Sequence, residues 1–351
     1  MDTLGIRSPR LTARDARRAF GKLRRALSGA RRIGENLYVW SPLVIPFHGS
    51  RLARRLNAWL LGVLTRRMMR TLRMSEPIVY AALPSALEVV KRLPRSALVY
   101  HCIDDYREFT DAPREAYEVM EDSLSRLADL TVVSSSRLLG LRRAAARNIT
   151  YLPHGVDLTW FERALEEDLV LEDVDELPRP LAGFVGRIGD WIDVELVFRS
   201  AEAMPDWSFV VVGPTNIDLT PYSRLPNLVF VGLKSFPEIP HYIKRFSVAL
   251  LPFVDNAVSA SVNPLKLYEY LAVGVPVVST PALDMAEFAG VVEVASRDQF
   301  PAAIRAAAEE DTEAARELRR TFVRRYSWRS IADELVQAID AARSGATVRA
   351  A

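Results

Sequence analysis

The chain of 351 residues is poor in cysteine and in long apolar runs, and each absence excludes a class of protein. Its one cysteine, Cys102, excludes an internal disulfide and a metal cluster built from cysteines. No run approaches the ~18 apolar residues of a membrane-spanning helix, so the sequence predicts none. The first residues lack a charged segment followed by an apolar core, which predicts no signal peptide. A cytoplasmic location is therefore expected.

Charge is abundant but unevenly placed. The formal net charge is only +2, yet residues 1–150 hold 27 Lys/Arg and 14 Asp/Glu, whereas the remainder holds 19 and 30. Residues 1–73 alone hold 17 basic and 3 acidic residues. Such asymmetry in a chain of this length predicts two domains with different surfaces. The basic half should face an anionic partner, which the charge alone leaves open as a membrane surface, nucleic acid or an acidic polymer.

Strands and helices alternate through most of the chain, in two series. The pattern predicts an α/β fold with parallel sheets. The first series of expected strands comprises Ile78–Ala82, Ala97–Cys102, Leu130–Val133 and Ile149–Leu152. The second comprises Leu181–Val185, Ser208–Val212, Leu228–Val231, Val248–Leu251, Val275–Val278 and Val291–Val294.

The segments outside the two series have their own character. Residues 7–32 and 50–73 are rich in arginine with apolar residues at helical spacing, which predicts two basic amphipathic helices. The acidic stretch from residue 158 to Pro180 shows little pattern, and we interpret it as the connection between the domains. Trp328–Ala342 is expected to be a C-terminal helix.

One segment, residues 263–280, combines a helix with two opposite charges. Asn263 and Pro264 predict a helix start, and Gly274 predicts its end. Lys266 and Glu269 are three apart and therefore share one face near the N-terminus of that helix. The free N–H groups of this end and the Lys266 charge suit a phosphate, and Glu269 can accept hydroxyl hydrogen bonds, as from a ribose. The alternative interpretation is an exposed salt bridge on a solvated helix.

This segment resembles the nucleotide-sugar signature of the GT-B glycosyltransferases, in particular glycosyltransferase family 4 and its teichuronic-acid and exopolysaccharide types. The resemblance implies that Lys266 binds the donor diphosphate and Glu269 the ribose. Many members carry a second glutamate eight residues before the ribose-binding one. Here that position is Ser261. The departure bears on how the donor sugar is held and on the stereochemistry of transfer.

The resemblance also implies an architecture: two Rossmann-like domains facing a cleft, with a C-terminal helix that crosses back to the first. We expect an acceptor-binding domain over residues 1–155, a donor-binding domain over 156–325 and the crossing helix over 326–351. The chain opens with residues 2–5, Asp-Thr-Leu-Gly, which look like the end of a strand. The first sheet is therefore expected to lack its opening strand.

Glycines follow two strands of the second series. Gly186 and Arg187 come directly after the first strand, and Gly213 follows the second. Glycines at the carboxyl end of a strand let a phosphate approach the backbone closely. In GT-B enzymes an equivalent loop holds the diphosphate, often with an arginine or lysine. We predict Gly186, Arg187 and Gly213 as donor-binding residues beside Lys266 and Glu269. Ordinary tight turns remain the alternative.

The first series carries a polar cluster after its second strand. His101, Asp104 and Asp105 lie between that strand and the next helix. A carboxylate or histidine within hydrogen-bond reach of an acceptor hydroxyl can act as a general base. An aspartate in a similar Asp-Asp motif is taken as the base in related exopolysaccharide glycosyltransferases. We predict Asp105, with Asp104 close behind, and His101 as catalytic residues. A helix cap and a structural histidine are the alternatives.

Together these features predict a hexosyltransferase on the inner face of the cell membrane. It would transfer a sugar from a nucleoside-diphosphate sugar, with UDP favoured over GDP, to a glycan or lipid-linked acceptor in cell-surface polysaccharide biosynthesis. No metal or other cofactor is expected, because cations and a helix N-terminus can neutralise the leaving diphosphate. The basic helices would face an anionic membrane, and no nucleic-acid motif is visible. The alternatives are a non-catalytic assembly subunit and a nucleotide-sugar epimerase.

Overall fold

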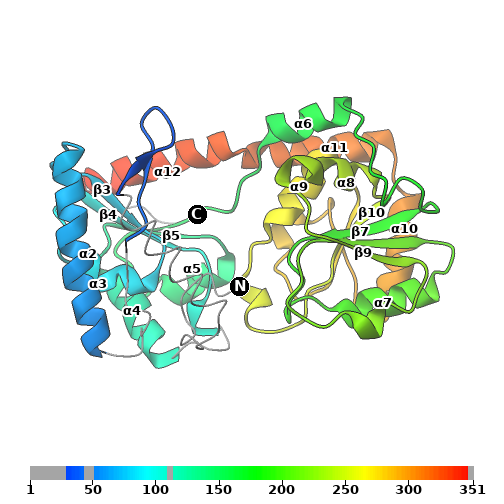
Figure 1. Ribbon diagram of the computed structural model, residues 1–351, viewed down its shortest axis with the longest axis horizontal. Helices are drawn as coiled ribbons and strands as arrows, with labels where there is room; N and C mark the ends of the chain where they lie inside the picture. Colours follow the sequence, from blue (N-terminus) through cyan, green and yellow to red (C-terminus); the bar gives the residue numbers. More distant parts are fainter. Residues whose placement is uncertain (1–28, 43–50, 109–113, 347–351) are drawn as a thin grey trace. The chain divides into compact units, whose positions relative to one another are not determined.

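The computed structural model describes residues 29–42, 51–108 and 114–346, and the chain divides into two compact units (Figure 1). The first unit takes the chain up to Val133, with Leu139–Thr150 and the residues from Ala338 onward. The second takes Ser134–Leu138 and Tyr151–Gln337. Most of the helix expected over residues 7–32 lies outside the described residues, and its last two residues form strand β1 instead.

The sheet of the first unit has four described strands, and their order in space follows their order in the chain. They are β3 (Ile78–Ala81), β4 (Ala97–Cys102), β5 (Leu130–Val133) and β6 (Ile149–Tyr151), in the order β3-β4-β5-β6. β4 pairs in parallel with β3 and with β5. Every residue of β5 is buried, as a central parallel strand covered on both faces requires. The predicted strands are confirmed to within one residue.

Helices and a hairpin surround this sheet in the first unit. The helical segments are α2 (Arg51–Thr71), η1 (Pro84–Ala86), α3 (Leu87–Val90), η2 (Tyr106–Glu108), α4 (Arg114–Leu127) and the part of α5 (Ser136–Arg142) from Leu139 onward. The hairpin pairs β1 (Arg31–Arg32) with β2 (Tyr38–Val39). Among the described residues, no helix is both long enough and apolar enough to cross a membrane.

The sheet of the second unit has six described strands, and their order reverses in the middle. They are β7 (Leu181–Val185), β8 (Ser208–Val212), β9 (Leu228–Gly232), β10 (Val248–Leu251), β11 (Val277–Ser279) and β12 (Glu293–Val294). Their order is β12-β11-β10-β7-β8-β9, and all five neighbouring pairs are parallel. Strands β8 and β9 therefore extend the sheet from one side of β7, and the later strands β10, β11 and β12 extend it from the other side.

Helices cover both faces of this second sheet (Figure 1). The helical segments of this unit are α6 (Leu158–Glu166), α7 (Val194–Ala203), η3 (Thr220–Tyr222), η4 (Phe236–Glu238), α8 (Ile239–Arg245), η5 (Ser259–Ser261), α9 (Leu265–Val273), η6 (Ala286–Phe288), α10 (Phe300–Glu309), α11 (Glu313–Val323) and η7 (Arg324–Tyr326). The last helix, α12 (Trp328–Arg343), begins in the second unit, and its residues from Ala338 onward belong to the first. Alternate residues of β7 point to opposite faces. Phe184 joins the core beneath α7 and α10, whereas Gly183 lies against the ring of Phe246 after α8.

The stretch from residue 158 to Pro180, expected to be a patternless connection, contains a helix and belongs to the second unit. Asp157 caps this helix, α6, by accepting a hydrogen bond of 3.1 Å from the Trp160 amide. The preceding Gly155 is needed for packing, because a Cβ there would lie 2.8 Å from the ring of Trp328. The acidic composition obscured a short amphipathic helix in which only Phe161 and Ala164 are buried.

Candidate functional site

The reversal of strand order in the second unit marks a candidate site. In open α/β sheets, ligands bind at the carboxyl ends of the strands where the order reverses. Here the reversal lies between β7 and β10, which are neighbours in the sheet. The segment from Gly186 to Asp193 follows β7, and the segment from Pro252 to Pro264 follows β10 and leads into α9. Four of the five predicted donor-binding residues lie in or next to these segments.

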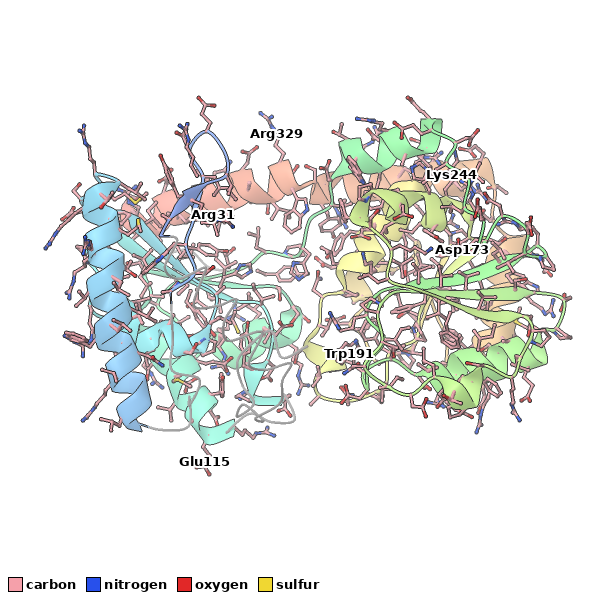
Figure 2. All side chains as sticks on the ribbon, viewed as in Figure 1. Arg31, Glu115, Asp173, Trp191, Lys244 and Arg329 are labelled. Carbon is pink, nitrogen blue, oxygen red and sulfur yellow. The ribbon has the colours of Figure 1, made fainter. Side chains whose placement is uncertain are left out.

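The two segments that flank the reversal are bonded to each other. The Asp193 amide donates to the Pro252 carbonyl at 2.7 Å, and the Val254 amide donates to the Trp191 carbonyl at 2.9 Å. The Asp193 side chain also accepts the Leu196 amide at the N-terminus of α7 and pairs with Arg297. Trp191 lies on this edge of the unit in Figure 2. These backbone bonds fix the segment carrying Arg187 relative to the start of α9.

Gly186 and Gly213 bring the ends of β7 and β8 into direct backbone contact. The Gly186 amide donates to Val212 at 2.9 Å, and the Gly213 amide donates to Gly232 at 2.8 Å. Gly213 has a φ of 146°, and a Cβ there would lie 1.8 Å from the Gly186 carbonyl oxygen. The Gly186 and Gly213 amides are thus engaged in extending the sheet. What these glycines provide is close approach of two strand ends.

Arg187 follows Gly186 and is exposed. Its guanidinium forms no ion pair with any residue that the structure describes, although the second unit holds many such pairs. An unpaired arginine beside the reversal has its five donors available for an anionic ligand. Its neighbour Ile188 is buried and bonded to Pro214, which holds the backbone that carries the arginine.

Helix α9 supplies the charged pair. Its end at Gly274 is as predicted: that residue is left-handed, with a φ of 87°, and its amide donates to Tyr270 and Leu271. Its start is one residue later than expected, with Pro264 at the cap position. The Asn263 side chain instead accepts a hydrogen bond from the His154 amide at 3.2 Å. Asn263 therefore bonds the segment after β6 to the start of α9 and does not cap the helix.

Lys266 and Glu269 form an ion pair of 2.6 Å on α9, but not on a solvated face. The Glu269 side chain is 5% exposed and that of Lys266 is 27% exposed. The pair Lys91–Glu88 has the same spacing, yet both of its side chains are more than 40% exposed. Burial raises the pKa of Glu269, and the charge and hydrogen bond of Lys266 oppose that rise. A buried carboxylate beside a half-buried lysine at a helix start is costly to maintain, which favours a binding role.

Tyr270 is a positioning residue that sequence reasoning missed. Its side chain is fully buried, and its Oη accepts a hydrogen bond of 2.8 Å from the Val185 amide, the last residue of β7. It thereby ties α9 to the strand that ends directly before Gly186. A tyrosine within a buried apolar run needs such a partner for its hydroxyl, and that was the available signal.

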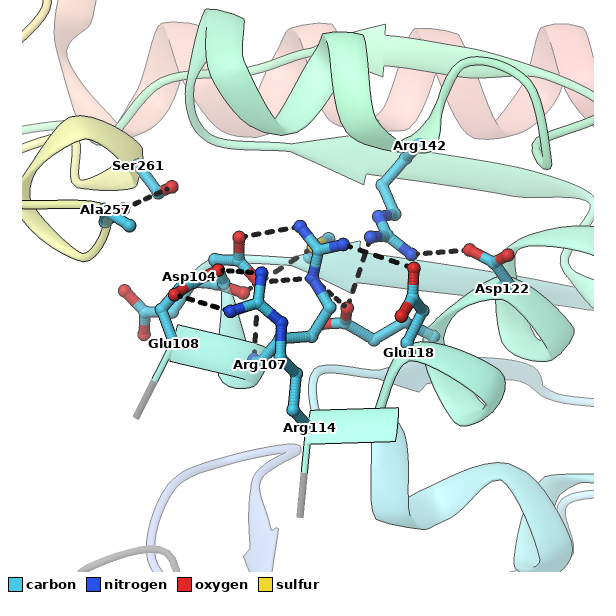
Figure 3. Close-up of polar contacts among 12 residues, drawn as sticks. Asp104, Arg107, Glu108, Arg114, Glu118, Asp122, Arg142, Ala257 and Ser261 are labelled. Carbon is cyan, nitrogen blue, oxygen red and sulfur yellow. Dashed lines mark hydrogen bonds and ion pairs between the residues drawn. The ribbon is translucent and has the colours of Figure 1, made fainter. Parts of the chain in front are cut away.

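Ser261 occupies the position at which many relatives carry a second glutamate. It is 1% exposed, and its hydroxyl donates to the carbonyl of Ala257, two residues before η5 begins, at 3.1 Å (Figure 3). The Ser261 hydroxyl therefore stabilises the local turn through this bond. It brings no charge to the segment between β10 and α9.

In the first unit, Asp105 is engaged by an arginine. Its carboxylate, 3% exposed, accepts two hydrogen bonds from the Arg107 guanidinium at 2.7 and 2.8 Å. Burial alone would raise the pKa of Asp105, but the bonds and charge of Arg107, with the charge of Arg142, hold that pKa below its ordinary value. A carboxylate with a lowered pKa that is already bonded twice is poorly suited to accept a proton.

The Asp105–Arg107 pair belongs to a buried charge network (Figure 3). Arg107 lies 3.8 Å from Glu121, and Arg142 lies 3.4 Å from the same Glu121 oxygen. Arg142, 2% exposed, also pairs with Asp122 at 2.8 Å. Burial raises the pKa of Glu121 to about 7 in spite of both arginines. Through these ion pairs the network joins the segment after β4 to α4 and α5.

Asp104 differs from its neighbour. Its carboxylate forms no hydrogen bond or ion pair within the described part of the chain, and burial raises its pKa. Both properties suit a general base better than those of Asp105. His101, on β4, bonds through Nδ1 to the Tyr80 hydroxyl on the neighbouring strand, and the two rings meet edge to face. That pairing fixes the plane of the imidazole.

The second unit matches a known family by sequence. Residues 179–310 match the model described as "Glycosyl transferases group 1", and this range includes all five predicted donor-binding residues. The chain is also 30% identical over 165 residues to TuaH of Bacillus subtilis (strain 168), which is named as a teichuronic acid biosynthesis glycosyltransferase. That alignment covers 44% of this chain and 42% of TuaH, so the chain spans less than half the length of this relative.

Solved structures match over a larger share of the chain. Sucrose-phosphate synthase from Thermosynechococcus elongatus has a TM-score of 0.67 at 14% identity, covering 90% of this chain and 86% of its own. The Anabaena protein HepE, in complex with UDP-glucose, has a TM-score of 0.60 at 16% identity, covering 79% and 82%. At these identities the likeness shows the fold alone. Residues 179–310 are therefore similar to the group 1 glycosyltransferases, within a chain that has the GT-B fold.

Proposed function

We propose that this protein transfers a sugar from a nucleoside-diphosphate sugar to a hydroxyl of a glycan or lipid-linked acceptor in cell-surface polysaccharide biosynthesis. One observation carries the proposal. The reversal between β7 and β10 places Arg187 and the start of α9, with Lys266, at the same edge of the sheet. The matched family range and the name of TuaH support it. UDP is the favoured nucleotide, because HepE was solved with UDP and UDP-glucose.

In the proposed reaction, the second unit binds the donor. Lys266 and Arg187 contact the diphosphate, helped by the positive end of the α9 dipole. Glu269 accepts hydrogen bonds from the ribose hydroxyls. When the acceptor oxygen bonds to the anomeric carbon, the bond from that carbon to the diphosphate breaks and negative charge grows on the leaving oxygen. The two cations stabilise that charge, so the proposed transfer requires no metal ion.

The acceptor hydroxyl must lose its proton as it attacks. We assign this proton to Asp104 rather than Asp105, because burial raises the pKa of Asp104 and no described residue pairs with it. Asp105 is instead a structural partner of Arg107. His101, fixed by Tyr80, remains a candidate contact for the acceptor.

Calorimetric titration with UDP and with GDP tests the donor site. Wild type should bind UDP more tightly than GDP, and Lys266→Ala should weaken UDP binding by about 10- to 100-fold, as expected for a lost charge-assisted bond. Lys91→Ala is the matched control, since it breaks an ion pair of the same spacing on the exposed surface of the first unit. Its affinity for UDP should equal that of wild type.

Absence of binding to either nucleotide by a folded wild-type protein would refute the donor site and favour a non-catalytic assembly subunit. Consumption of UDP-sugar without an acceptor, giving an isomeric UDP-sugar, would identify an epimerase instead. Transfer that survives excess EDTA would support the metal-free route, and transfer abolished by EDTA and restored by a divalent cation would overturn it.

A further inference from the structure

Helix α2 of the first unit carries an exposed apolar stripe. Leu52, Leu56, Trp59 and Val63 are between 38% and 77% exposed. Their spacing of four, three and four residues places them within about 60° of one another around a helix of 3.6 residues per turn. Four large apolar side chains in one row along a single helix exceed the scattered exposure that is normal for a protein surface.

The opposite side of α2 is packed, so the stripe is not the core-facing side of the helix. Asn57, Ala58 and Met69 are buried there. A Cβ on Gly62 would lie 3.4 Å from Arg92, just after α3. Figure 1 shows α2 lying alongside α3. The helix therefore has two apolar faces, of which one is used within the unit.

Cations border the stripe. Helix α2 has six arginines and no acidic residue. Helical geometry places Arg55 and Arg67 about 60° to either side of the stripe, and Arg70 continues its line. All three are exposed, and none forms an ion pair with a described residue. An apolar row flanked by unpaired cations on a helix of 21 residues is complementary to a surface with negative charge above hydrocarbon.

We infer that the α2 stripe, defined as Leu52, Leu56, Trp59 and Val63 with the bordering arginines, lies in the headgroup region of an anionic lipid bilayer. The helix lies parallel to the membrane plane, with the apolar row inserted and Arg55 and Arg67 on lipid phosphates. Trp59 sits at the depth that tryptophan prefers. This inference deepens the proposed function, which includes a lipid-linked acceptor, by naming the surface that contacts the membrane, but it does not depend on the donor site.

Other occupants fit less well. A second copy would bring the same arginines against these, with like charges opposed. The chain's own residues 1–28 hold eight Lys/Arg and two Asp, so they are repelled for the same reason. Nucleic acid would pair with the arginines but would leave the apolar row in water. A lipid interface satisfies both the charge and the apolar area.

Co-sedimentation with vesicles tests the inference. Wild type should partition about tenfold or more in favour of vesicles containing phosphatidylglycerol over pure phosphatidylcholine. Leu56→Ser/Trp59→Ser should lower partitioning to anionic vesicles by about tenfold or more, because it removes most of the inserted area. Arg55→Glu/Arg67→Glu should abolish the preference for anionic lipid. In wild type, anionic vesicles should shift tryptophan emission to shorter wavelength, and Trp59→Phe should remove that shift.

Val119→Ser is the matched control. Val119 is equally exposed in the first unit, but it lies on α4 near the carboxylates of Glu115 and Glu118. This variant should bind vesicles like wild type. Equal vesicle binding by the serine double variant and wild type would overturn the inference, as would a wild-type dimer that the double variant dissociates. All variants should bind UDP like wild type. A wild-type protein that binds UDP but does not bind anionic vesicles would refute only this inference and leave the donor site intact.

Discussion

The two units both place polar residues after buried parallel strands, yet they use them in opposite ways. After β7, the polar side chain of Arg187 is exposed and unpaired among the described residues, and the backbone is held by glycine contacts and cross-bonds. After β4, the charges of Asp105 and Arg107 are turned inward and neutralise each other with Glu121 and Arg142. One region keeps its charge available, and the other uses it for structure.

Sheet topology explains part of this difference. The second sheet reverses its strand order at β7, which leaves the neighbouring strand ends uncovered by a connection. The four described strands of the first sheet run in sequence order, so each strand end there lies beside the next crossover. Polar residues beside crossovers can bond to the adjoining helices, as Arg107 does with Glu118 and Glu121 of α4. A dense polar cluster in a sequence is therefore weaker evidence of a ligand site than a topological reversal.

Replacing Gly213 should have the largest effect, because it disrupts the backbone contact with Gly186 that joins the ends of β7 and β8. Gly213→Ala should lower the free energy of unfolding by about 4 kcal/mol or more, since the Cβ cannot share space with the Gly186 carbonyl. Gly232→Ala is the control, with a φ of 80° but nothing within 4 Å of its Cβ, and should cost about 1 kcal/mol. Urea denaturation measures both. Equal losses of unfolding free energy in the two variants would show that the contact between the ends of β7 and β8 does not contribute to stability.

Substitution of the two adjacent aspartates should affect different properties: Asp105 the free energy of unfolding, and Asp104 the rate of sugar transfer. Asp105→Asn should cost about 3 kcal/mol of unfolding free energy, because it leaves Arg107 and its buried surroundings without their closest countercharge. Asp104→Asn should change stability by about 0.5 kcal/mol or less, yet lower the rate of sugar transfer about 100-fold or more. Each variant is the control for the other in denaturation and transfer assays. A stable, inactive Asp105→Asn protein would return the role of base to Asp105.

The smallest effect expected is a pH dependence from Glu121. Burial raises its pKa from 4.5 to about 7 in the folded protein, so the folded state binds its proton more tightly than the unfolded state does. This contribution to stability is complete below pH 4.5, decreases as the pH rises towards 7, and is absent above it. Glu121→Gln should therefore reduce the loss of stability between pH 5 and 8 by about 2 kcal/mol.

Urea denaturation at the two pH values measures this slope. Glu118→Gln is the control, since its side chain is 53% exposed and lies 3.7 Å from Arg107 at the edge of the same network. It should keep the wild-type dependence. A Glu121→Gln protein with an unchanged slope would mean that this carboxylate is ionised throughout.

Sequence by itself determined the elements that rest on local patterns. Strands such as Ala97–Cys102 and Leu181–Val185 were identified from buried apolar runs, and the end of α9 from Gly274, because both signals lie within a few residues. The segment around Lys266 and Glu269 was identified in the same way. Helix α6 was missed, because an acidic surface and only two buried positions left little periodicity.

Only the tertiary structure decided how the polar residues are used. Asp104 and Asp105 are adjacent and indistinguishable by type, but Arg107, Arg142 and Glu121 reach only one of them, from positions up to 37 residues away. Tyr270 likewise acquires its role by bonding to Val185, 85 residues earlier. Burial, hydrogen bonds and countercharges depend on which segments meet in space, and local sequence patterns carry no such information.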